Sequence, residues 1–272
     1  MSPSRPLRFL LALVPLAVAP VVHADADRDA LAKSLSNPVA ALISVPFQFN
    51  VDAGYGADRN GTRTTLNLQP VVPVSIGEDW NLISRTILPV LTQHGVSAPG
   101  TTESGLGDIV QSVFLSPKAP TASGWIWGAG PVFLLPSGRT GFSAGQWAAG
   151  PTAVVLKQQN GYTFGALANH LWGLSGHGSL PATGLPDLNA TFVQPFVSKS
   201  LGRGATLAAN LESTYDWNRS AWTVPLNVSY SQVLPVGHQL VSLGGGVRGY
   251  LASPTGGPDW GLRLTVTLLY PR

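Results

Sequence analysis

The alternation of apolar and polar residues, repeated along nearly the whole chain, constrains the fold more than any other feature of this sequence. Between Leu207 and Trp217 every second residue is apolar, aromatic or small, and the residues between them include Glu212 and Asp216. After the short segment NRSA the same alternation resumes. Because successive side chains of a β-strand point to opposite faces, this pattern predicts two long strands with one apolar and one polar face.

The alternation recurs in twelve segments, most of them close in length to the roughly 9–11 residues that a tilted strand needs to cross a bilayer. The segments that start at Asp108 and Leu188 alternate less regularly than the others. Together they predict an all-β protein with about 12 antiparallel strands. The segments are Leu42–Asp52, Thr64–Ile76, Trp80–Gln93, Asp108–Ser116, Gly124–Leu135, Gln146–Lys157, Thr163–Gly173, Leu188–Ser200, Ala205–Asp216, Trp222–Leu234, Leu240–Ala252 and Trp260–Tyr270.

Composition narrows the class of all-β protein. Only 11% of the 272 residues are charged, whereas globular proteins average about 25%. The 31 glycines and 23 prolines favour many strands joined by turns over a helical enzyme. Beyond the N-terminus there is no run of about 18 apolar residues, which a membrane-spanning helix requires. A membrane form of this protein must therefore cross the bilayer with strands.

The connectors between the segments alternate in length. Long connectors such as HGVSAPGTTESGLG follow the odd-numbered segments, short ones such as GED and QQNGY follow the even-numbered segments, and NRSA is the exception. Outer-membrane barrels have an even number of strands, long external loops and short periplasmic turns. The pattern therefore predicts that both ends of the barrel lie on the periplasmic side. At the end of one long connector, Asp108 is placed to bind loop backbone.

Large aromatic residues gather near the two ends of the predicted strands, and most share the apolar parity. Aromatic girdles at both membrane interfaces are typical of transmembrane barrels. We therefore expect the apolar parity to face lipid, the polar parity to face a lumen, and the sheet to close, because strands in lipid must satisfy every backbone N–H and C=O. The external set is Trp147, Tyr215, Trp217, Trp222, Tyr250 and Trp260, and the periplasmic set is Trp80, Trp125, Trp127 and Tyr270.

Prolines inside the segments oppose this interpretation. Each one removes a hydrogen-bond donor from the ladder between strands. Bulges or kinks can absorb some of them, but the sequence alone does not explain so many. They are Pro70, Pro73, Pro89, Pro131, Pro151, Pro195 and Pro225.

The N-terminus has the pattern of a secretory signal peptide. Arg5 and Arg8 precede the apolar stretch Phe9–Val22, and small residues that permit cleavage follow, up to Ala24 or Ala26. We expect the signal peptide, 1–24, to be removed on export to the outer membrane. A membrane anchor is the alternative, but the apolar stretch is short and interrupted by prolines.

Residues 25–40 are expected to form a leader that contains a short helix. Leu31 and Leu35 share one helical face, and Asn37-Pro38 ends the pattern. This helix either plugs the periplasmic mouth, enters the lumen, or leads loosely into the barrel formed by residues 41–272.

Charge and cysteine content exclude several partners and chemistries. Of the 16 basic residues, Arg5 and Arg8 belong to the signal peptide, which leaves 14 against 13 acidic residues and a net charge of about +1. The basic residues form no cluster, so nucleic acid is not expected as a partner. The chain has no cysteine, so it has no disulfide and no thiolate chemistry.

Expected partners are membrane lipid, a small-molecule permeant and the outer-membrane assembly machinery. Assembly signals often end in a terminal aromatic residue, whereas Tyr270 is followed by Pro271-Arg272 in this chain. No cofactor and no metal is expected, because no ligand motif is present and His170 and His177 are too loosely placed to form a metal site.

Several long strings resemble a known bacterial family. Among them are GLGDIVQSVFLSP, GWIWGAGPVFLLP, GALANHLWG, ESTYDW and LNLQPVVPVSIGEDWNLISRTILPV. They are similar to outer-membrane transporters related to the phenol-degradation meta-pathway family, whose members are sometimes mislabelled neuromedin U. The resemblance covers nearly the whole mature chain. It implies an outer-membrane β-barrel and uptake of small apolar or aromatic molecules, and it brings no catalytic motif.

Charged residues with lumen parity are the candidate functional residues. Glu212, Asp216, Arg248 and Arg263 have inward-facing positions on the last predicted strands, and Arg85 has a similar position earlier in the chain. Charges in a low-dielectric lumen tend to pair. They form either a pore-lining cluster that orients a permeant or an ion-pair network that fills and rigidifies a narrow barrel, and we favour the network.

Catalysis has little support in the sequence. The segment GFSAG matches the hydrolase elbow G-x-S-x-G, but the elbow needs a helix after the serine, whereas Ser143 is predicted in a glycine-rich loop. An enzyme that acts on membrane lipid would need a Ser/His pair at the outer rim. His170 is available there, and no matching serine is obvious.

A barrel of about 12 strands has a lumen between the filled interior of eight-stranded barrels and the open channel of porins. We therefore expect an outer-membrane channel or transporter for passive uptake of small molecules, and not an enzyme. The long loops or the N-terminal helix are candidate gates. The alternatives are a lipid-modifying enzyme, a non-conducting structural barrel and a soluble periplasmic β-protein.

Overall fold

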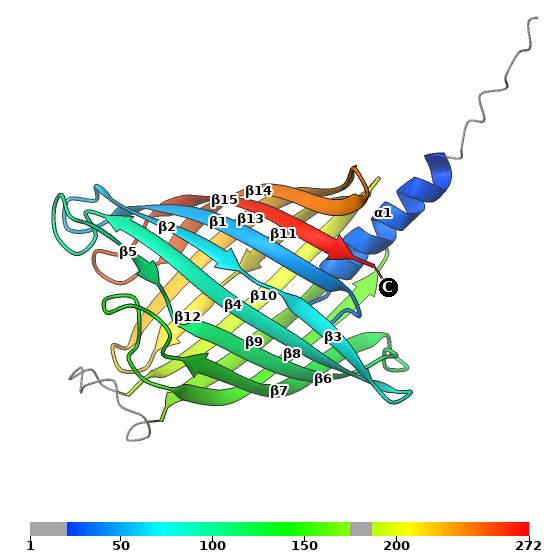
Figure 1. Ribbon diagram of the computed structural model, residues 1–272, viewed down its shortest axis with the longest axis horizontal. Helices are drawn as coiled ribbons and strands as arrows, with labels where there is room; N and C mark the ends of the chain where they lie inside the picture. The colour runs from blue at the N-terminus through cyan, green and yellow to red at the C-terminus, as the bar shows by residue number, and fades with distance from the viewer. Residues whose placement is uncertain (1–20, 175–186, 272) are drawn as a thin grey trace, which may run out of the picture.

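The computed structural model describes residues 21–174 and 187–271, which form a closed antiparallel β-barrel with a helix at one end (Figure 1). No helix in these ranges is long and apolar enough to cross a membrane. The helix is α1 (Val21–Leu35). The strands are β1 (Ile43–Tyr55), β2 (Gly61–Leu68), β3 (Val71–Ile76), β4 (Trp80–His94), β5 (Thr102–Leu106), β6 (Ile109–Pro117), β7 (Trp125–Leu135), β8 (Ala148–Gln159), β9 (Tyr162–Gly173), β10 (Asn189–Gly202), β11 (Ala205–Leu211), β12 (Ser213–Asp216), β13 (Ala221–Val236), β14 (Gln239–Ala252) and β15 (Trp260–Tyr270).

The predicted twelve-stranded closed barrel is confirmed. Two of the predicted strands are each divided by a short break, so β2 continues into β3 and β11 into β12, and one barrel strand begins earlier than predicted, since β5 continues into β6. The barrel closes between its first and last strands, because β1 pairs with β15 from Ile43 opposite Tyr270 to Ala53 opposite Trp260. The strand β5 was expected to be part of a long loop. It forms because its backbone pairs with β4, although TESGL has no apolar alternation.

The long loops and the short turns lie at opposite ends of the barrel, as their alternation predicted. Long connectors such as 95–101 and 136–147 gather at one end, here called the long-loop end. Two- or three-residue turns such as 160–161 and 237–238 gather at the other, here called the short-turn end, together with α1 and the C-terminus (Figure 1). The four-residue connector 217–220 is the short exception at the long-loop end.

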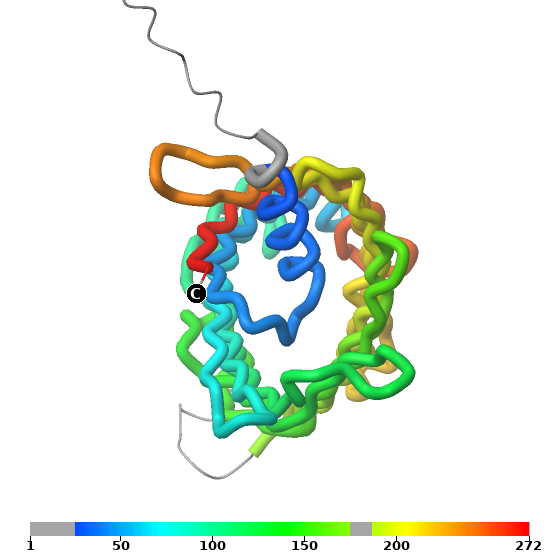
Figure 2. The backbone as a smooth tube through the Cα atoms, turned by 90° about the vertical axis from the view of Figure 1, so that its right-hand side faces the viewer, coloured from blue at the N-terminus to red at the C-terminus, as the bar shows by residue number. Residues whose placement is uncertain are grey.

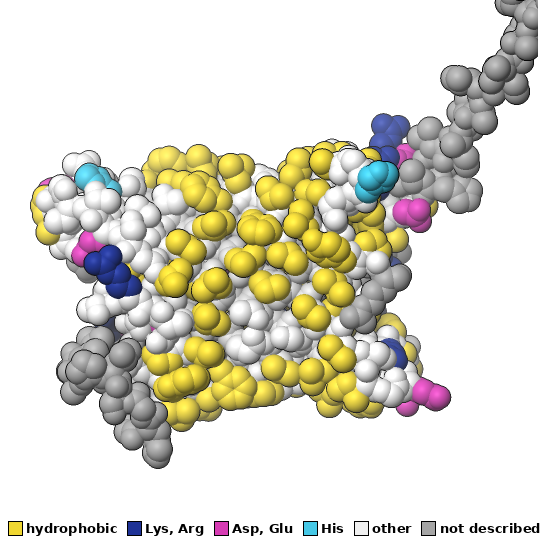
Figure 3. Space-filling view, in the orientation of Figure 1, with side chains coloured by type: hydrophobic (Ala, Val, Ile, Leu, Met, Phe, Trp, Pro, Cys, Tyr) yellow, Lys and Arg dark blue, Asp and Glu magenta, His cyan; other side chains and the backbone are white. Residues whose placement is uncertain are grey.

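The inward and outward faces of the strands match the predicted parities. On β15, Leu262 and Leu264 are 49% and 61% exposed, whereas the intervening Arg263 is 8% exposed. Figure 3 shows the result on one face: apolar side chains are spread over the middle of the barrel, and charged side chains lie at the two ends. This arrangement is the inverse of a soluble sandwich, and it is the one that a bilayer requires.

All eight tryptophans are exposed on the outer surface, as a girdle at each end predicts. At the short-turn end Trp80 meets Trp127 edge to face, with ring centroids 5.9 Å apart. At the long-loop end the ring of Tyr215 contacts the rings of Trp217 and Trp222, with ring centroids 4.8 and 4.9 Å apart. Tyr250 does not belong to the outer set. It has the same parity as Arg248 and lies against the guanidinium of that residue.

The structure explains how several prolines fit into the sheet. Pro70 lies in the break between β2 and β3. The pairing of β6 with β7 skips Pro131, and the pairing of β8 with β9 skips Pro151. Each follows a glycine, Gly130 or Gly150, where a Cβ atom would clash with a carbonyl oxygen of the neighbouring strand. On that side of each proline the ladder is interrupted and glycine lets the chains approach, whereas on the other side β7 and β8 stay paired, with Pro131 opposite Pro151.

The N-terminal helix is longer than expected. It was predicted within residues 25–40, and in the structure α1 begins at Val21. The segment VVHADA contains no glycine or proline, so nothing in it breaks the helix. The candidate cleavage sites after Ala24 and Ala26 fall within α1. Residues 1–20 lie outside the described part of the chain, and cleavage of the signal peptide stays a prediction.

Candidate functional site: the barrel lumen

The lumen has two unlike walls. One side, here called the apolar wall, is built by inward residues of β4, β6 and β8–β10, and the leader segment adds one residue to it. Its members are Val39, Ile83, Phe114, Val154, Leu156 and Leu167, with Phe192 and Phe196 packed against them. The opposite side, here called the polar wall, is built by β1 and β11–β15, and its members are Asn50, Asp52, Asn210, Glu212, Asn227, Arg248 and Arg263.

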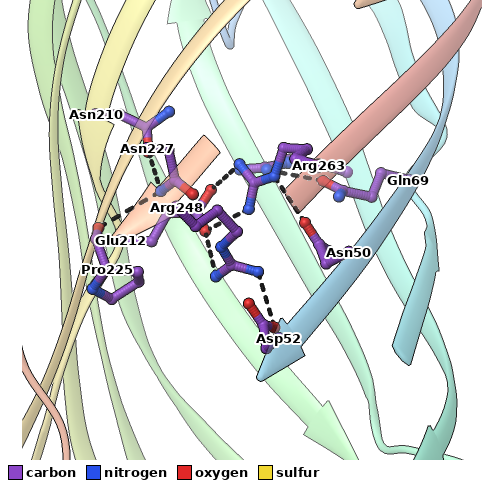
Figure 4. Close-up of polar contacts among 10 residues, drawn as sticks. Asn50, Asp52, Gln69, Asn210, Glu212, Pro225, Asn227, Arg248 and Arg263 are labelled. Carbon is purple, nitrogen blue, oxygen red and sulfur yellow. Dashed lines mark hydrogen bonds and ion pairs between the residues drawn. The ribbon is translucent and has the colours of Figure 1, made fainter. Parts of the chain in front are cut away.

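Glu212 is the centre of an ion-pair network on the polar wall. Its two carboxylate oxygens accept hydrogen bonds from Nη1 and Nη2 of Arg263 at 2.9 and 2.8 Å, a bidentate geometry (Figure 4). The same carboxylate lies 3.6 Å from Nη2 of Arg248. Arg263 also donates from Nε to Oδ1 of Asn50, at 2.7 Å. Glu212 therefore bridges two arginines, and bidentate contacts of this type hold a guanidinium in one orientation.

Asp52 extends the network toward the long-loop end. It accepts a hydrogen bond from Nη1 of Arg248 at 3.1 Å, and both side chains are buried. Behind the network, Nδ2 of Asn227 donates to Oδ1 of Asn210 at 2.9 Å. The contacts connect strands from distant parts of the sequence, so they brace the polar wall across the seam between β1 and β15.

Glu212 faces the lumen because its barrel strand keeps its register across a short break. Glu212 occupies the break between β11 and β12, and its backbone N–H donates to the carbonyl of Pro225 at 3.2 Å. Leu211 lies opposite Leu226 and Thr214 lies opposite Thr223 on β13, so no residue is added or lost at the break. Because proline has no N–H to donate to the ladder, the pairing is interrupted at Pro225 while the inward parity of Glu212 is kept.

Arg85 lies beside this network without an ion pair. It comes from β4, and Nη2 donates to Oε1 of Gln69 at 3.2 Å. Among the described residues no carboxylate oxygen lies within 4.0 Å of its guanidinium. Glu212 acts on it only as a more distant charge.

Asp216 is the predicted site residue that the structure places apart. It ends β12, and its Oδ1 accepts hydrogen bonds from the backbone N–H groups of Asn218 and Arg219 at 2.9 and 3.1 Å. Its carboxylate is 3.8 Å from Nε of Arg219, whose side chain is 75% exposed. Asp216 therefore stabilises the turn at the long-loop end. Of the five predicted residues the structure brings three together, Glu212, Arg248 and Arg263, and a pore-lining role for the set stays a prediction.

Several members of the network were not predicted from the sequence. Asn50 and Asp52 have visible inward parity in the first predicted strand. Their proximity to Arg248 and Arg263 depends on the register across the seam, where Asp52 lies opposite Gly261 and Asn50 opposite Arg263. The opposite charges of Asp52 on β1 and of Arg248 and Arg263 on the last two strands were the one signal that could have suggested the pairing.

The helix α1 occupies the mouth of the barrel at the short-turn end (Figure 2). Ala32 is 3% exposed and packs with Leu42, Val233 and Leu269. Two hydrogen bonds attach the helix to the rim, since Oδ1 of Asp29 accepts from the N–H of Gly204 at 2.6 Å and the Lys33 carbonyl accepts from Nε2 of Gln158 at 2.9 Å. Of the three arrangements that the sequence left open, the structure shows a helix packed in the mouth.

Two cavities flank the helix. The larger, here called the Arg85 cavity, has a volume of about 340 Å³ and lies between the C-terminal half of α1 and the ion-pair network. The smaller has a volume of about 260 Å³ and lies between α1 and the turn that joins β8 to β9. The helix therefore divides the space at the short-turn end without filling it.

At the opposite end, a long loop is fixed across the start of β6. Asp108 accepts hydrogen bonds from the backbone N–H groups of Gly138 and Ala144 at 3.0 and 2.7 Å, which confirms the predicted contact with loop backbone. Arg139 donates to the carbonyl of Ser104 at 2.9 Å. These contacts hold the connector 136–147 against β5.

The residues considered for catalysis do not form the predicted elbow. Ser143 lies in the connector 136–147 and accepts a hydrogen bond from the N–H of Gly145, and no helix follows it in the described chain. On the outer rim, Nδ1 of His170 lies 2.7 Å from Oγ1 of Thr191, which also accepts from Nε1 of Trp217 at 2.8 Å. His177 lies outside the described residues. A threonine therefore occupies the place where the enzyme hypothesis required a serine.

No protein-family model matches this chain, and no curated protein matches it. Solved structures do. The COG4313 outer membrane channel from Pseudomonas putida F1 superimposes with a TM-score of 0.65 at 14% identity, over 85% of this chain and 96% of that one. The NanC porin superimposes with a TM-score of 0.48 at 10% identity, over 85% of this chain and 100% of that one. Outer membrane phospholipase A from Escherichia coli has a TM-score of 0.49 at 13% identity, over 84% of this chain and 90% of that one. The likeness to the first of these shows the fold, an outer-membrane β-barrel.

Proposed function

We propose that the protein is an outer-membrane channel for the passive uptake of small molecules, among them molecules of aromatic character. The observation that supports this most strongly is the two-sided lumen, with an apolar wall of Phe114, Phe192 and Phe196 facing a charged wall around Glu212. Ligand sites combine apolar surface with a few fixed polar groups in this way. The resemblance to transporters of the phenol-degradation group points to the same class of permeant.

In this mechanism a small molecule enters at the long-loop end, which faces the outside, and leaves past α1 into the periplasm. Its apolar body slides along the apolar wall while its polar group exchanges water for the groups of the polar wall. The network matters because Arg263 and Arg248 are held by Glu212 and do not collapse across the path. Fixed donors of this kind guide a solute without reorganisation.

The charges of the network predict a preference for anions. Arg85, Arg248 and Arg263 face the carboxylates of Asp52 and Glu212, so one positive charge remains unbalanced. Purified protein in planar bilayers is expected to give small, discrete conductance steps. In a salt gradient, the reversal potential is expected to shift toward the equilibrium potential of chloride. Tight seals without steps would instead favour the non-conducting structural barrel.

A lipid-modifying enzyme stays the second candidate because of one observation, the contact of His170 with Thr191 at the outer rim. Within the described residues Nε2 of His170 has no hydrogen-bond partner, so no acidic group orients the imidazole as in a catalytic triad. Purified protein is expected to release no fatty acid from phospholipid vesicles. Turnover that disappears in Thr191→Val would replace the channel proposal by the enzyme.

A further inference from the structure

Arg85 is a lumen cation that has no ion pair among the described residues. A guanidinium has five N–H donors, and the structure gives this one a hydrogen bond to the neutral amide of Gln69. The carboxylate of Glu212 is already shared by Arg263 and Arg248, and Asp52 is bound to Arg248. A charge inside a protein is costly unless it is paired, so the guanidinium of Arg85 favours a bound anion.

The Arg85 cavity has the chemistry of a site for a small organic anion. Among the residues that line it, the charged ones are Arg85 and Arg263, and both are cationic. Its other polar lining is made of neutral amides and hydroxyls, which can donate hydrogen bonds to a carboxylate, and among them are Gln48, Gln69, Gln194, Asn210, Ser229 and Ser231. Val71 and Phe196 lie on the side of the apolar wall.

The size of the cavity limits the ligand. About 340 Å³ is near the lower end of the roughly 300–1,000 Å³ typical of small-molecule sites. The C-terminal half of α1, with Leu35, forms one side of the cavity, so a bound molecule would lie between the helix and the network. One ring with one carboxylate fits within this volume.

We propose that Arg85 binds the carboxylate of a small aromatic or similarly compact monoanion within the Arg85 cavity, as a station on the permeation path. A single negative charge matches the single unbalanced positive charge of the network. A bidentate contact to the guanidinium supplies orientation, and the ring lies toward Val71 and Phe196. The role as a station rests on the proposed channel function, whereas the binding itself does not.

The test uses the full mature chain in detergent and measures binding of benzoate and of benzamide by isothermal titration calorimetry. Benzamide has the same shape without the charge. We expect benzoate to bind about tenfold or more tightly than benzamide, and Arg85→Gln to remove this difference. Arg85→Lys should bind benzoate with intermediate affinity, since lysine keeps the positive charge but lacks the two parallel N–H donors of the guanidinium. The matched control is Arg219→Gln, which removes an exposed arginine at the long-loop end and should bind as the wild type does.

Equal binding of benzoate and benzamide to the wild type, wild-type affinity in Arg85→Gln, or no binding of benzoate at all would each overturn the site. Preferential binding of inorganic phosphate would overturn the choice of a monoanionic carboxylate. Arg85 has no ion pair to lose, so its variants should keep the wild-type thermal unfolding, which is checked first. If the protein conducts ions but does not bind benzoate, only the proposed binding site is overturned. If it binds benzoate but never conducts, only the proposed channel function is overturned.

Discussion

Replacing Ala32 by aspartate is expected to raise the conductance of the barrel several-fold. Ala32 is the buried contact by which α1 packs against Leu42, Val233 and Leu269. An aspartate there would place an unpaired carboxylate among apolar side chains, which costs about 3 kcal/mol of packing free energy. The two hydrogen bonds that attach the helix contribute about 0.5–1.5 kcal/mol each, so the helix should leave the mouth.

The matched control is Ala30→Asp, which adds the same charge to the same helix at an exposed position. It should conduct as the wild type does. Single-channel recording gives the conductance, and protease sensitivity of α1 shows whether the helix has left the barrel. A freed helix without a change in conductance would show that α1 does not limit the path.

Replacing Glu212 by glutamine is expected to lower the free energy of unfolding of the barrel by about 3 kcal/mol, at the lower end of the range for breaking a buried pair. The change leaves Arg263 without a carboxylate partner and leaves Arg248 with Asp52 alone. The lower end is appropriate because the Glu212 side chain is 22% exposed, and water screens part of the charge. The added positive charge in the lumen should also strengthen the preference for chloride.

Asp216→Asn is the matched control for this change, since it removes a carboxylate from the same barrel strand. The asparagine oxygen can still accept from the turn backbone, and the ion pair with Arg219 is exposed, so the loss should stay below about 0.5 kcal/mol. Urea titration followed by tryptophan fluorescence measures both variants. Similar losses of stability in the two would contradict a central role for Glu212.

The fold was accessible from the sequence because its signals are local. The alternation from Leu207 to Trp217 and the tryptophans at strand ends each depend on neighbouring residues, so they predicted the strand number, the faces and the two ends of the barrel. Where the local signal is absent, prediction failed. The segment TESGL has no alternation and becomes β5 because β4 offers it a partner.

The site was accessible only in part, because its geometry depends on register. Parity alone places Glu212, Arg248 and Arg263 inside the barrel, but it gives the same position to Asp216, which ends β12 and binds the following turn, with its Oδ1 2.9 Å from the Asn218 nitrogen. A contact between Arg248 and Asp52 joins residues 196 positions apart. No local pattern determines which residues meet across the seam of a closed sheet.

The central claim is that hydrocarbon lies outside the barrel and water inside it, and the eight tryptophans test this without any mutation. All of them are exposed on the outer surface, in two girdles. In vesicles of brominated phospholipid, their fluorescence is expected to be strongly quenched, more by bromines near the glycerol backbone than by bromines near the chain ends, and only weakly by aqueous acrylamide. Emission that acrylamide quenches and brominated lipid does not would contradict the account.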